Sequence, residues 1–541
     1  MHVASKPIKR LPWRLPSADG VPCVMPRLTA FLLTLGVSLV TGCAVGPNYR
    51  TPKLSTPAGY AEAVGAAAPA SAPAGGPPAA APAVDLTSWW HALKDPELDS
   101  LIERAVSGNP DVIIALDRLQ AARVFEAGII GTVLPEAQAA IGGGRGTGND
   151  LARGRAPATQ ISAANTTGVE HINVVGGFDA LWELDVFGKY RRQIEAARYD
   201  TQATLAARNS VLVAVIADIA RAYIDLRGLQ VRASVLSASI DALRESLRIV
   251  SIRYQRGITN ELDVTLATRE LATLEAQAAP LDAEVHAAEY TIAVLLGAYP
   301  EDMVKELSVT GMVPSVPGAV AVGLPVELLR RRPDIQQAER ELAGATARIG
   351  VATANLFPSV FVSGSLGFQR QQAPGLPTIG QHIWSLGAGA AWPLLDFGQL
   401  DAQVEIADLQ TRALLVNYKK TIQGAVREVD TNIGRYAAQQ VSLGKLETAL
   451  LASQRAVTLA NERYERGLTD FLNVVDAERE EYDIEEQYTG AQVADAEEFI
   501  ELYRSLGGGW QNYQALPPIH RPEPAVIAMF QRVLSRSDPL K

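Results

Sequence analysis

The chain has 541 residues, of which 48% are hydrophobic and 20% are charged, and its formal net charge is −10. This acidic balance argues against a nucleic-acid partner and against a basic domain on a membrane surface. With a mean hydropathy of +0.06, the composition excludes a disordered chain and a protein made mainly of membrane-spanning helices.

The N-terminus resembles the signal of a bacterial lipoprotein. Arg27 precedes the apolar stretch Leu28–Val40, which is followed by Thr-Gly and then by Cys43. The stretch is too short for a stable membrane span and is followed by small residues, as in cleaved secretory signals. The resemblance predicts that residues 1–42 are removed and that Cys43 becomes the lipidated first residue. Because Ala44 rather than Asp follows the cysteine, it also implies export to the outer membrane.

The cysteine count limits the possible chemistry. Cys23 lies in the leader, and whether translation starts at Met1 or Met25 stays open. Once the signal is removed, Cys43 remains as the one cysteine, and lipidation would consume its thiol. We therefore expect no disulfide, thiolate metal site or cysteine nucleophile in the mature chain.

A stretch dominated by Pro, Ala and Gly follows, from Thr51 to Val84. Such a composition cannot bury a core and predicts a flexible tether. Order is expected to begin near Trp89 and Trp90.

A tandem duplication organises the rest of the chain. The sequence RYQRG at 253–257 is echoed by RYERG at 463–467, 210 positions later. The same offset joins Trp182 to Trp392 and relates the Phe-Gly and Leu-Gly pairs of the two copies. A second offset of 223 joins the Pro-Asp pairs at 110 and 333, so the first copy holds 13 additional residues (223 − 210) before Trp182. Repetition at a fixed spacing predicts one architecture built twice.

Each copy opens with a helix. Asn109-Pro110-Asp111 combines a capping Asn, a Pro at the first helical position and an acid near the positive end of the helix dipole. The second copy keeps Pro333 and Asp334 without the Asn cap. Both helices are expected to run about 25 residues, to Pro135 and Pro358.

After each proline the hydrophobic period changes to two, which indicates strands. In the first copy one face is apolar and the other polar: Ile172, Val174, Gly176, Phe178, Ala180, Trp182 and Leu184 against His171, Asn173, Gly177, Asp179, Glu183 and Asp185. The second copy repeats the apolar face as Trp384, Leu386, Ala388, Ala390, Trp392 and Leu394. Partner strands are expected at about 136–148 and 359–371, so the chain supplies two hairpins.

Four strands cannot close a barrel, because small barrels need about eight. If these strands enter a membrane, several chains must pool their hairpins, because an open sheet with an apolar outer face would aggregate. A small soluble sheet packed on helices is the alternative. The tryptophans at the strand ends favour the membrane, since they fit an interfacial aromatic girdle.

A long helix follows each hairpin. Apolar residues at alternating spacings of four and three form a seam that runs from Ala222 through Leu236 and Leu243 to Tyr254. A more polar seam runs from Tyr436 to Tyr464 in the second copy. Seams of this length are typical of coiled coils. Each helix is expected to end at the glycine of the RY-x-RG turn, and a second long helix returns over about 261–296 and 470–506.

No catalytic or metal-binding constellation is present in the sequence. The five histidines after the signal lack metal-ligand spacing: His91, His171, His286, His382 and His520. The glycine-rich run 142–148 lacks the helix and Lys-Ser/Thr of a phosphate site, and a hairpin loop is the preferred interpretation. Arg330–Arg332 is interpreted as a solvated basic turn, and the acidic tract 478–486 as a solvated helix face. We predict no enzyme activity, no metal and no cofactor.

One polar set lies just beyond the second turn. Asp470, Asn473 and Asp476 recur every three residues, and Asp263 occupies the position of Asn473 in the first copy. Compensation of the helix dipole would be sufficient to explain Asp470.

These features together resemble the outer-membrane efflux family of TolC and OprM, in its NodT-type lipoprotein branch. The resemblance rests on the lipoprotein signal followed by Val-Gly-Pro-Asn-Tyr (45–49), on the stretch 324–335 with its RRRPDI end, and on the twin RY-x-RG turns. It covers the chain from Cys43 to Trp510. It implies an α+β membrane protein in which a homotrimer pools four strands per chain into a twelve-stranded outer-membrane β-barrel, while the duplicated long helices form an α-barrel across the periplasm.

The resemblance also implies a function and its sites. The protein would be the passive exit duct of a tripartite efflux pump for drugs or small toxic compounds. It would work with a periplasmic adaptor and an inner-membrane transporter of the RND type. The adaptor would dock on the tip turns, Arg256, Gly257, Ile258, Thr259, Arg466, Gly467, Leu468 and Thr469. The family's constricting acids fall at Asn473 and Asp476, with Asp470 and Asp263 as further candidates, and the Asn departs from the family pattern.

The predicted organisation is a signal peptide (1–42), a lipidated Pro/Ala-rich segment (43–88), a first repeat (89–310, strands about 136–185, helices about 189–297), a second repeat (311–510, strands about 359–395, helices about 399–506) and a tail (511–541). Two related functions stay open as alternatives, the exit duct of a type I protein secretion system and a periplasmic adaptor lipoprotein. The adaptor would have one coiled-coil hairpin rather than two copies with strand pairs. A coiled-coil lipoprotein without a pore would leave the strands unexplained.

Overall fold

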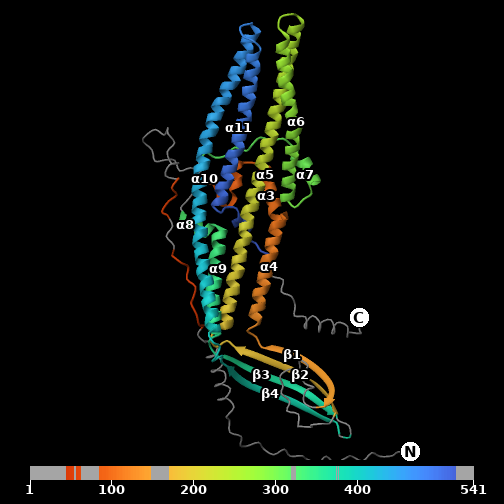
Figure 1. The fold of residues 1–541 in the computed structure, drawn as a ribbon, viewed down its shortest axis with the longest axis vertical. Helices are drawn as coiled ribbons and strands as arrows, with labels where there is room; N and C mark the ends of the chain where they lie inside the picture. Colours follow the sequence, from red (N-terminus) through yellow and green to blue (C-terminus); the bar gives the residue numbers. More distant parts are fainter. Residues whose placement is uncertain are drawn as a thin grey trace, which may run out of the picture. The chain divides into compact units, whose positions relative to one another are not determined.

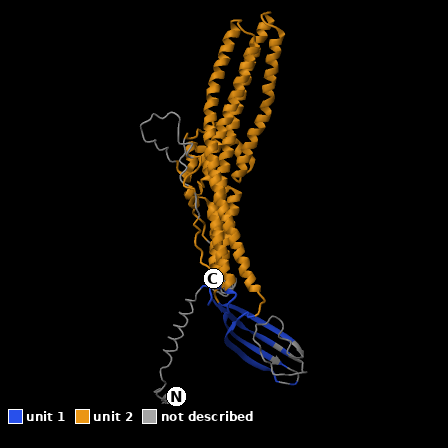
Figure 2. Cartoon of the chain, turned by 60° about the vertical axis from the view of Figure 1, so that its left-hand side comes forward, with its two compact units in different colours: residues 1–45, 135–191, 354–394 blue, residues 46–134, 192–353, 395–541 orange. Residues whose placement is uncertain are grey.

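The structure is a computed structural model that describes residues 44–53, 57–62, 84–147, 170–318, 325–372, 375 and 377–518. The signal, Cys43 and the end of the tail lie outside these residues. The chain divides into two compact units, which Figure 2 colours separately. One comprises the strands (135–191 and 354–394, with 1–45), and the other comprises the long helices (46–134, 192–353 and 395–541).

The strand unit is one antiparallel sheet in the order β1-β2-β3-β4. Its strands are β1 (Glu136–Thr147), β2 (Glu170–Leu184), β3 (Ser359–Gln372) and β4 (Ile379–Ala391). The four expected strands are therefore present, but two details of the sequence interpretation are wrong. The glycines at 142–146 belong to β1 and not to a loop, and β4 ends at Ala391, before Trp392 and Leu394.

The register confirms that the sheet has one apolar and one polar face. Phe178 pairs with Leu366, which pairs with Trp384, and these side chains are 66%, 63% and 76% exposed. One residue further along, Asp179 pairs with Ser365 and Ser365 with Ser385. The two serine hydroxyls are 2.7 Å apart. Large apolar side chains that remain exposed on one face need a partner surface, whether lipid or protein.

In the part of the chain that the structure describes, the long helices of the helical unit pair into two hairpins (Figure 1). The first hairpin is α5 (Lys189–Gln255) with α6 (Glu261–Leu295), and the second is α10 (Gln399–Glu465) with α11 (Leu472–Ser505). The helices that open the two copies are α4 (Pro110–Gly131) and α9 (Pro333–Ala354). Shorter elements complete the unit: η1 (Leu86–Leu93), α3 (Pro96–Gly108), α7 (Pro300–Leu307), α8 (Pro325–Arg331) and η3 (Trp510–Tyr513).

The main core lies midway along the helices and is rich in aromatic rings. Trp89 stacks on Tyr503 at 5.9 Å and contacts Phe499 at 6.1 Å, and all three are almost completely buried. Nearer the tips, the predicted seam of α5 is confirmed at Leu236 and Leu243, which pack against α6 and α11. Within the described helices, a window of α5 is apolar enough to cross a membrane, but 61% of that window is buried inside the unit. This burial is typical of a core helix.

The N-terminal segment is more ordered than its composition predicts. The expectation that order begins near Trp89 is wrong, because residues 44–53 and 57–62 are already placed. Tyr60 is 2% exposed in the main core, and the backbone N–H of Ala61 donates to Asp430 Oδ1 at 2.8 Å. The buried Tyr60 ring and this hydrogen bond hold residues 60–61 along α10, and Tyr49 packs against the same core.

The 210-residue repeat is also a repeat of backbone conformation. Three glycine pairs at this offset have nearly equal positive φ angles: 82° and 83° at Gly188 and Gly398, 67° and 68° at Gly257 and Gly467, and 73° and 74° at Gly297 and Gly507. L side chains rarely adopt these angles, so each pair marks a turn that needs glycine in both copies. Positions 210 apart therefore occupy equivalent places in the two hairpins.

Candidate functional site

The turn between α5 and α6 lies at the free end of the first hairpin (Figure 1). The N–H of Gly257 donates to the carbonyl of Tyr254 at 2.9 Å, and the N–H of Ile258 donates to that of Arg253 at 2.9 Å. This pair of bonds is the Schellman pattern, in which a glycine with positive φ ends the helix. Ile258 stays 60% exposed, so the turn presents an apolar side chain to solvent.

The turn between α10 and α11 repeats this geometry at the same end of the unit (Figure 1). Gly467 donates to Tyr464 at 3.0 Å and Leu468 donates to Arg463 at 2.9 Å. Leu468 is 63% exposed, close to the value for Ile258. The two tips thus offer nearly identical shapes, each with one exposed aliphatic residue.

Two of the predicted gate residues are hydrogen-bonded to the turns that precede their helices. Thr259 donates its hydroxyl to Asp263, whose own N–H donates to the capping side chain of Asn260 at 3.1 Å. In the second copy, Asn473 donates to the hydroxyl of Thr469 at 2.8 Å. Asp263 and Asn473 thus each contact the threonine four residues earlier, but the hydrogen bond runs in the opposite direction, because Thr259 donates and Thr469 accepts.

The other two predicted gate residues are open to solvent. Asp470 is exposed, and its carbonyl accepts the N–H of Asn473. Asp476 lies about one helical turn after Asn473 in α11. Its carboxylate is 3.8 Å from the guanidinium of Arg479, and about half of each side chain is exposed. Such an exposed pair contributes little to stability.

Below the tips, the two hairpins of the chain meet along a seam. Arg253 of α5 lies over the ring of Tyr464 of α10 at 4.5 Å. Tyr464 is 8% exposed and contacts the ring of Phe471 at 5.2 Å. Val250 and Val474 are buried in the same cluster. This apolar seam holds the first hairpin against the second.

Sequence reasoning missed a set of partly buried acids next to this seam. Glu478, Glu481 and Glu485 of α11 line a pocket of about 290 Å³ whose other walls come from α5, α6 and α10. Ser246 donates to Glu478 Oε1 at 3.0 Å, whereas Oε2 is buried without a hydrogen-bond partner in the described part of the chain. The interpretation of this tract as a solvated face is wrong on the side that faces α5.

Burial dominates the electrostatics of this pocket. It raises the pKa of Glu478 from 4.5 to about 6, although the Ser246 hydrogen bond opposes the shift and the charge of Glu481 assists it. Burial also raises the pKa values of Glu481 and Glu485. Charged groups that face the pocket from other positions are Glu270 of α6, paired with its neighbour Arg269, and Arg479 of α11.

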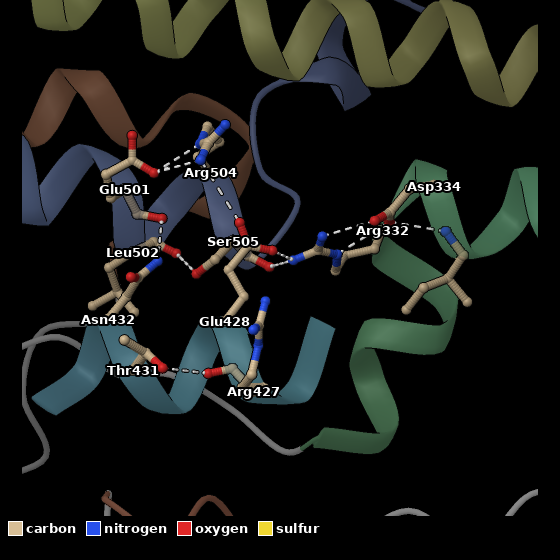
Figure 3. Close-up of polar contacts among 11 residues, drawn as sticks. Arg332, Asp334, Arg427, Glu428, Thr431, Asn432, Glu501, Leu502, Arg504 and Ser505 are labelled. Carbon is tan, nitrogen blue, oxygen red and sulfur yellow. Dashed lines mark hydrogen bonds and ion pairs between the residues drawn. The ribbon is translucent and has the colours of Figure 1, made fainter. Parts of the chain in front are cut away.

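The basic turn before α9 is also more buried than predicted. Arg332 forms a bidentate pair with Asp334 and donates at 2.7 Å to both Glu428 Oε2 of α10 and the carbonyl of Ser505 at the end of α11 (Figure 3). Its side chain is 12% exposed. Arg504 adds an ion pair to Glu501 at 2.7 Å in the same network. The solvated-turn interpretation is therefore wrong for Arg332, which joins three helices.

The predicted lipidation site, Cys43, lies outside the described residues, but the chain is fixed within the helical unit from Gly46 onward. Arg192 donates to the carbonyl of Gly46 at 3.2 Å and to Asn48 Oδ1 at 2.7 Å. A Cβ at Gly46 would lie 2.5 Å from Cα of Gly350. No cluster of three or more metal-ligating side chains occurs among the residues that the structure describes.

Comparison with known proteins identifies relatives along most of the chain. The family model described as "Outer membrane efflux protein" matches residues 146–298 and 324–508. Nodulation protein T of Rhizobium leguminosarum bv. trifolii is 29% identical over 84% of the chain and 91% of its own length. The solvent efflux pump outer membrane protein SrpC of Pseudomonas putida is 30% identical over 77% of the chain and 86% of its own length.

Solved structures share the fold. The outer-membrane channel OprN is 34% identical, has a TM-score of 0.75, and covers 87% of this chain and 100% of its own. CusC has a TM-score of 0.69 over 86% of this chain at 22% identity, which is a likeness of fold alone. The long helices and four antiparallel strands described above are thus the architecture of known outer-membrane channels.

Proposed function

Because the chain belongs to the outer membrane efflux protein family, and is thus the outer-membrane channel component of an efflux pump, we propose that three copies form one passive duct. The observation that carries this proposal is the four-stranded sheet with its exposed apolar face. Phe178, Leu366 and Trp384 would face lipid, and the Asp179–Ser385 side would line the pore. Three sheets joined at the free edges of β1 and β4 would give the twelve strands of a closed barrel.

Exposed apolar side chains on the helices support the same assembly. Phe125 of α4 is 62% exposed, Val416 and Val441 of α10 are 64% and 65% exposed, and Leu451 is 64% exposed. Large apolar side chains exposed on a helix are candidates for contact with a neighbouring copy. In a trimer, neighbouring copies would cover these residues and complete a helical tunnel.

The tip turns, Arg256–Thr259 and Arg466–Thr469, are the proposed docking surface for a periplasmic adaptor. Their matching backbones and the exposed Ile258 and Leu468 offer one repeated apolar contact per hairpin. Through the adaptor the duct would be coupled to an inner-membrane transporter of the RND type. A secreted-protein cargo is the remaining alternative.

The proposed cargo is a small toxic or hydrophobic compound. Two relatives are named as outer membrane proteins of solvent and toluene efflux pumps. Another is named as a pyoverdine export outer membrane protein, so relatives of similar identity serve different cargo. Cys43 is the proposed lipid anchor, and the Arg192 contacts to Gly46 and Asn48 would hold the chain next to it.

The proposed constriction lies at Asp476, with Asp470, Asn473 and Asp263 nearby. Three carboxylates around a narrow opening would attract cations and slow anions. The test is to reconstitute the purified protein into planar bilayers and to compare Asp476→Ala with Asp282→Ala, a change at an exposed acid of α6. We expect both to conduct and only Asp476→Ala to lose cation selectivity.

The outcomes separate two claims. Unchanged ion selectivity in Asp476→Ala contradicts the position of the constriction and leaves the duct in place. The proposed duct itself is contradicted if the protein forms no pore in the bilayer and shows no trimer band that shifts on a gel after heating.

A further inference from the structure

The contact between Arg253 and Tyr464 has a counterpart that one chain cannot make. Arg253 belongs to the first copy and Tyr464 to the second, so their contact joins copy one to copy two. At an offset of 210, Arg253 corresponds to Arg463, and Tyr464 corresponds to Tyr254. The same Arg-Tyr pair thus exists in reverse, with the arginine on the second copy and the tyrosine on the first.

The reverse pair is open in the single chain. Tyr254 is 44% exposed, compared with 8% for Tyr464. Arg463 is exposed and makes no ion pair or ring contact with any residue that the structure describes. Because Gly257 and Gly467 end their helices with equal φ angles, the two Arg-Tyr dipeptides have the same orientation on their hairpins. Each dipeptide can form an Arg-Tyr stacking contact. Within the chain Arg253 stacks on Tyr464, whereas Arg463 and Tyr254 have no such contact with each other.

A ring of identical chains supplies the missing partner. In a closed ring, the second copy of each chain meets the first copy of the next, and the junction repeats the one within the chain. We propose that Arg463 stacks on Tyr254 of the partner subunit and so joins the tips of neighbouring chains. This inference rests on the proposed trimer and specifies one contact within it. The stacking of a guanidinium on an aromatic ring is favourable in partly solvated sites.

The junction between subunits differs chemically from the junction within the chain. Within the chain, Tyr464 is flanked by Phe471 and Val475, which are 2% and 1% exposed. The residues 210 positions before these two are Glu261 and Thr265. The partner subunit's Glu261 therefore takes the place of an apolar ring beside Arg463. The contact between subunits combines stacking with charge attraction and is weakened by salt, whereas the stacked pair within the chain is flanked by apolar side chains.

Cross-linking distinguishes the two junctions. In a Cys23→Ser background that keeps Cys43 as the predicted lipid site, the double variant Tyr254→Cys/Arg463→Cys is treated in detergent with a short bismaleimide. We expect the band on a denaturing gel to shift from monomer to dimer and trimer masses. The matched control, Arg253→Cys/Tyr464→Cys, should link within one chain and stay at monomer mass. Each single-cysteine variant should also stay at monomer mass.

Measurement of the native mass of every sample keeps the result interpretable. A trimer whose 254–463 pair gives no higher bands, or links only at monomer mass, overturns the proposed contact while the duct stands. A wild-type protein that is not a trimer overturns both. If the double variant itself fails to assemble, Glu261→Gln in the wild-type background gives the second readout. The Glu261→Gln trimer should dissociate less on addition of salt than the wild-type trimer does. An unchanged salt dependence contradicts the proposed attraction between Glu261 and Arg463.

Discussion

The buried carboxyl of Glu478 makes the stability of the helical unit depend on pH. In the unfolded chain this group loses its proton near its ordinary pKa of 4.5, and in the fold it keeps the proton up to about 6. Between these values the folded state holds more protons, so the free energy of unfolding falls as the pH rises. The contribution is present in full below pH 4.5 and is lost above the folded pKa.

The size of the effect follows from the shift. One pKa unit corresponds to 1.36 kcal/mol, so a rise of about 1.5 units destabilises the ionised fold by about 2 kcal/mol. Glu478→Gln keeps the shape of the side chain and an oxygen that can accept the Ser246 hydrogen bond, but it cannot ionise. We therefore expect the variant to be more stable than the wild type by about 2 kcal/mol above pH 7 and nearly equal to it at pH 4.

The assay is denaturant unfolding of the detergent-solubilised protein, followed by circular dichroism across this pH range. Glu480→Gln is the matched control, because Glu480 is exposed on the same helix, and it should leave the pH dependence unchanged. Glu481 and Glu485 titrate in the same direction, so Glu478→Gln should reduce the slope without removing it. An unchanged slope, or a variant that is less stable at neutral pH, would refute the reasoning.

Two further substitutions test packing in the helical unit. Arg332→Ala removes the cation that pairs with Asp334 and Glu428 and should cost about 2–3 kcal/mol in the same unfolding assay, because it leaves the two carboxylates without their shared partner. Arg330→Ala, at an exposed position two residues earlier, is the control and should change stability by less than about 0.5 kcal/mol; equal effects of the two would contradict the role of Arg332. Gly228→Ala places a Cβ against Cγ2 of Val493 and should cost about 1–2 kcal/mol despite the better helix propensity of alanine. Adding Gly228→Ala to Val493→Ala should then be neutral or stabilising, and a further loss of stability would show that the overlap is not the cause.

The sequence predicts the elements of this fold better than it predicts their burial. The tips could be predicted because their signals are local. In each copy a heptad seam ends at an RY-x-RG sequence, and its glycine, Gly257 or Gly467, suits the positive φ of a helix end. Glu478 could not be recognised, because α11 carries charged residues around its whole circumference at this level, including the exposed Glu480 and Asp483. Which of these residues faces the other hairpin depends on contacts between helices that are more than 200 residues apart.

The same limit applies to the basic turn. Arg330, Arg331 and Arg332 are chemically alike in the sequence, and the burial of Arg332 is decided by the positions of Glu428 and Ser505. Conversely, one aromatic residue, Tyr60, orders a segment that its neighbours would leave flexible. The average composition of a segment predicts flexibility here, whereas its actual order depends on whether an individual residue such as Tyr60 is buried.

Because the two copies differ in charged residues, the junction within each chain and the junction between chains of the proposed ring should respond differently to pH and to salt. Within the chain, the junction carries Glu478 and Glu481, and the equivalent positions 210 residues earlier are Thr268 and Leu271. Protonation therefore acts mainly on the junction within each chain. Salt acts mainly on the junction between chains, where Glu261 replaces Phe471. A duct with nearly sixfold backbone symmetry would then respond to acid and to ionic strength at alternate junctions, because the repeat conserves the backbone turns and not the charges beside them.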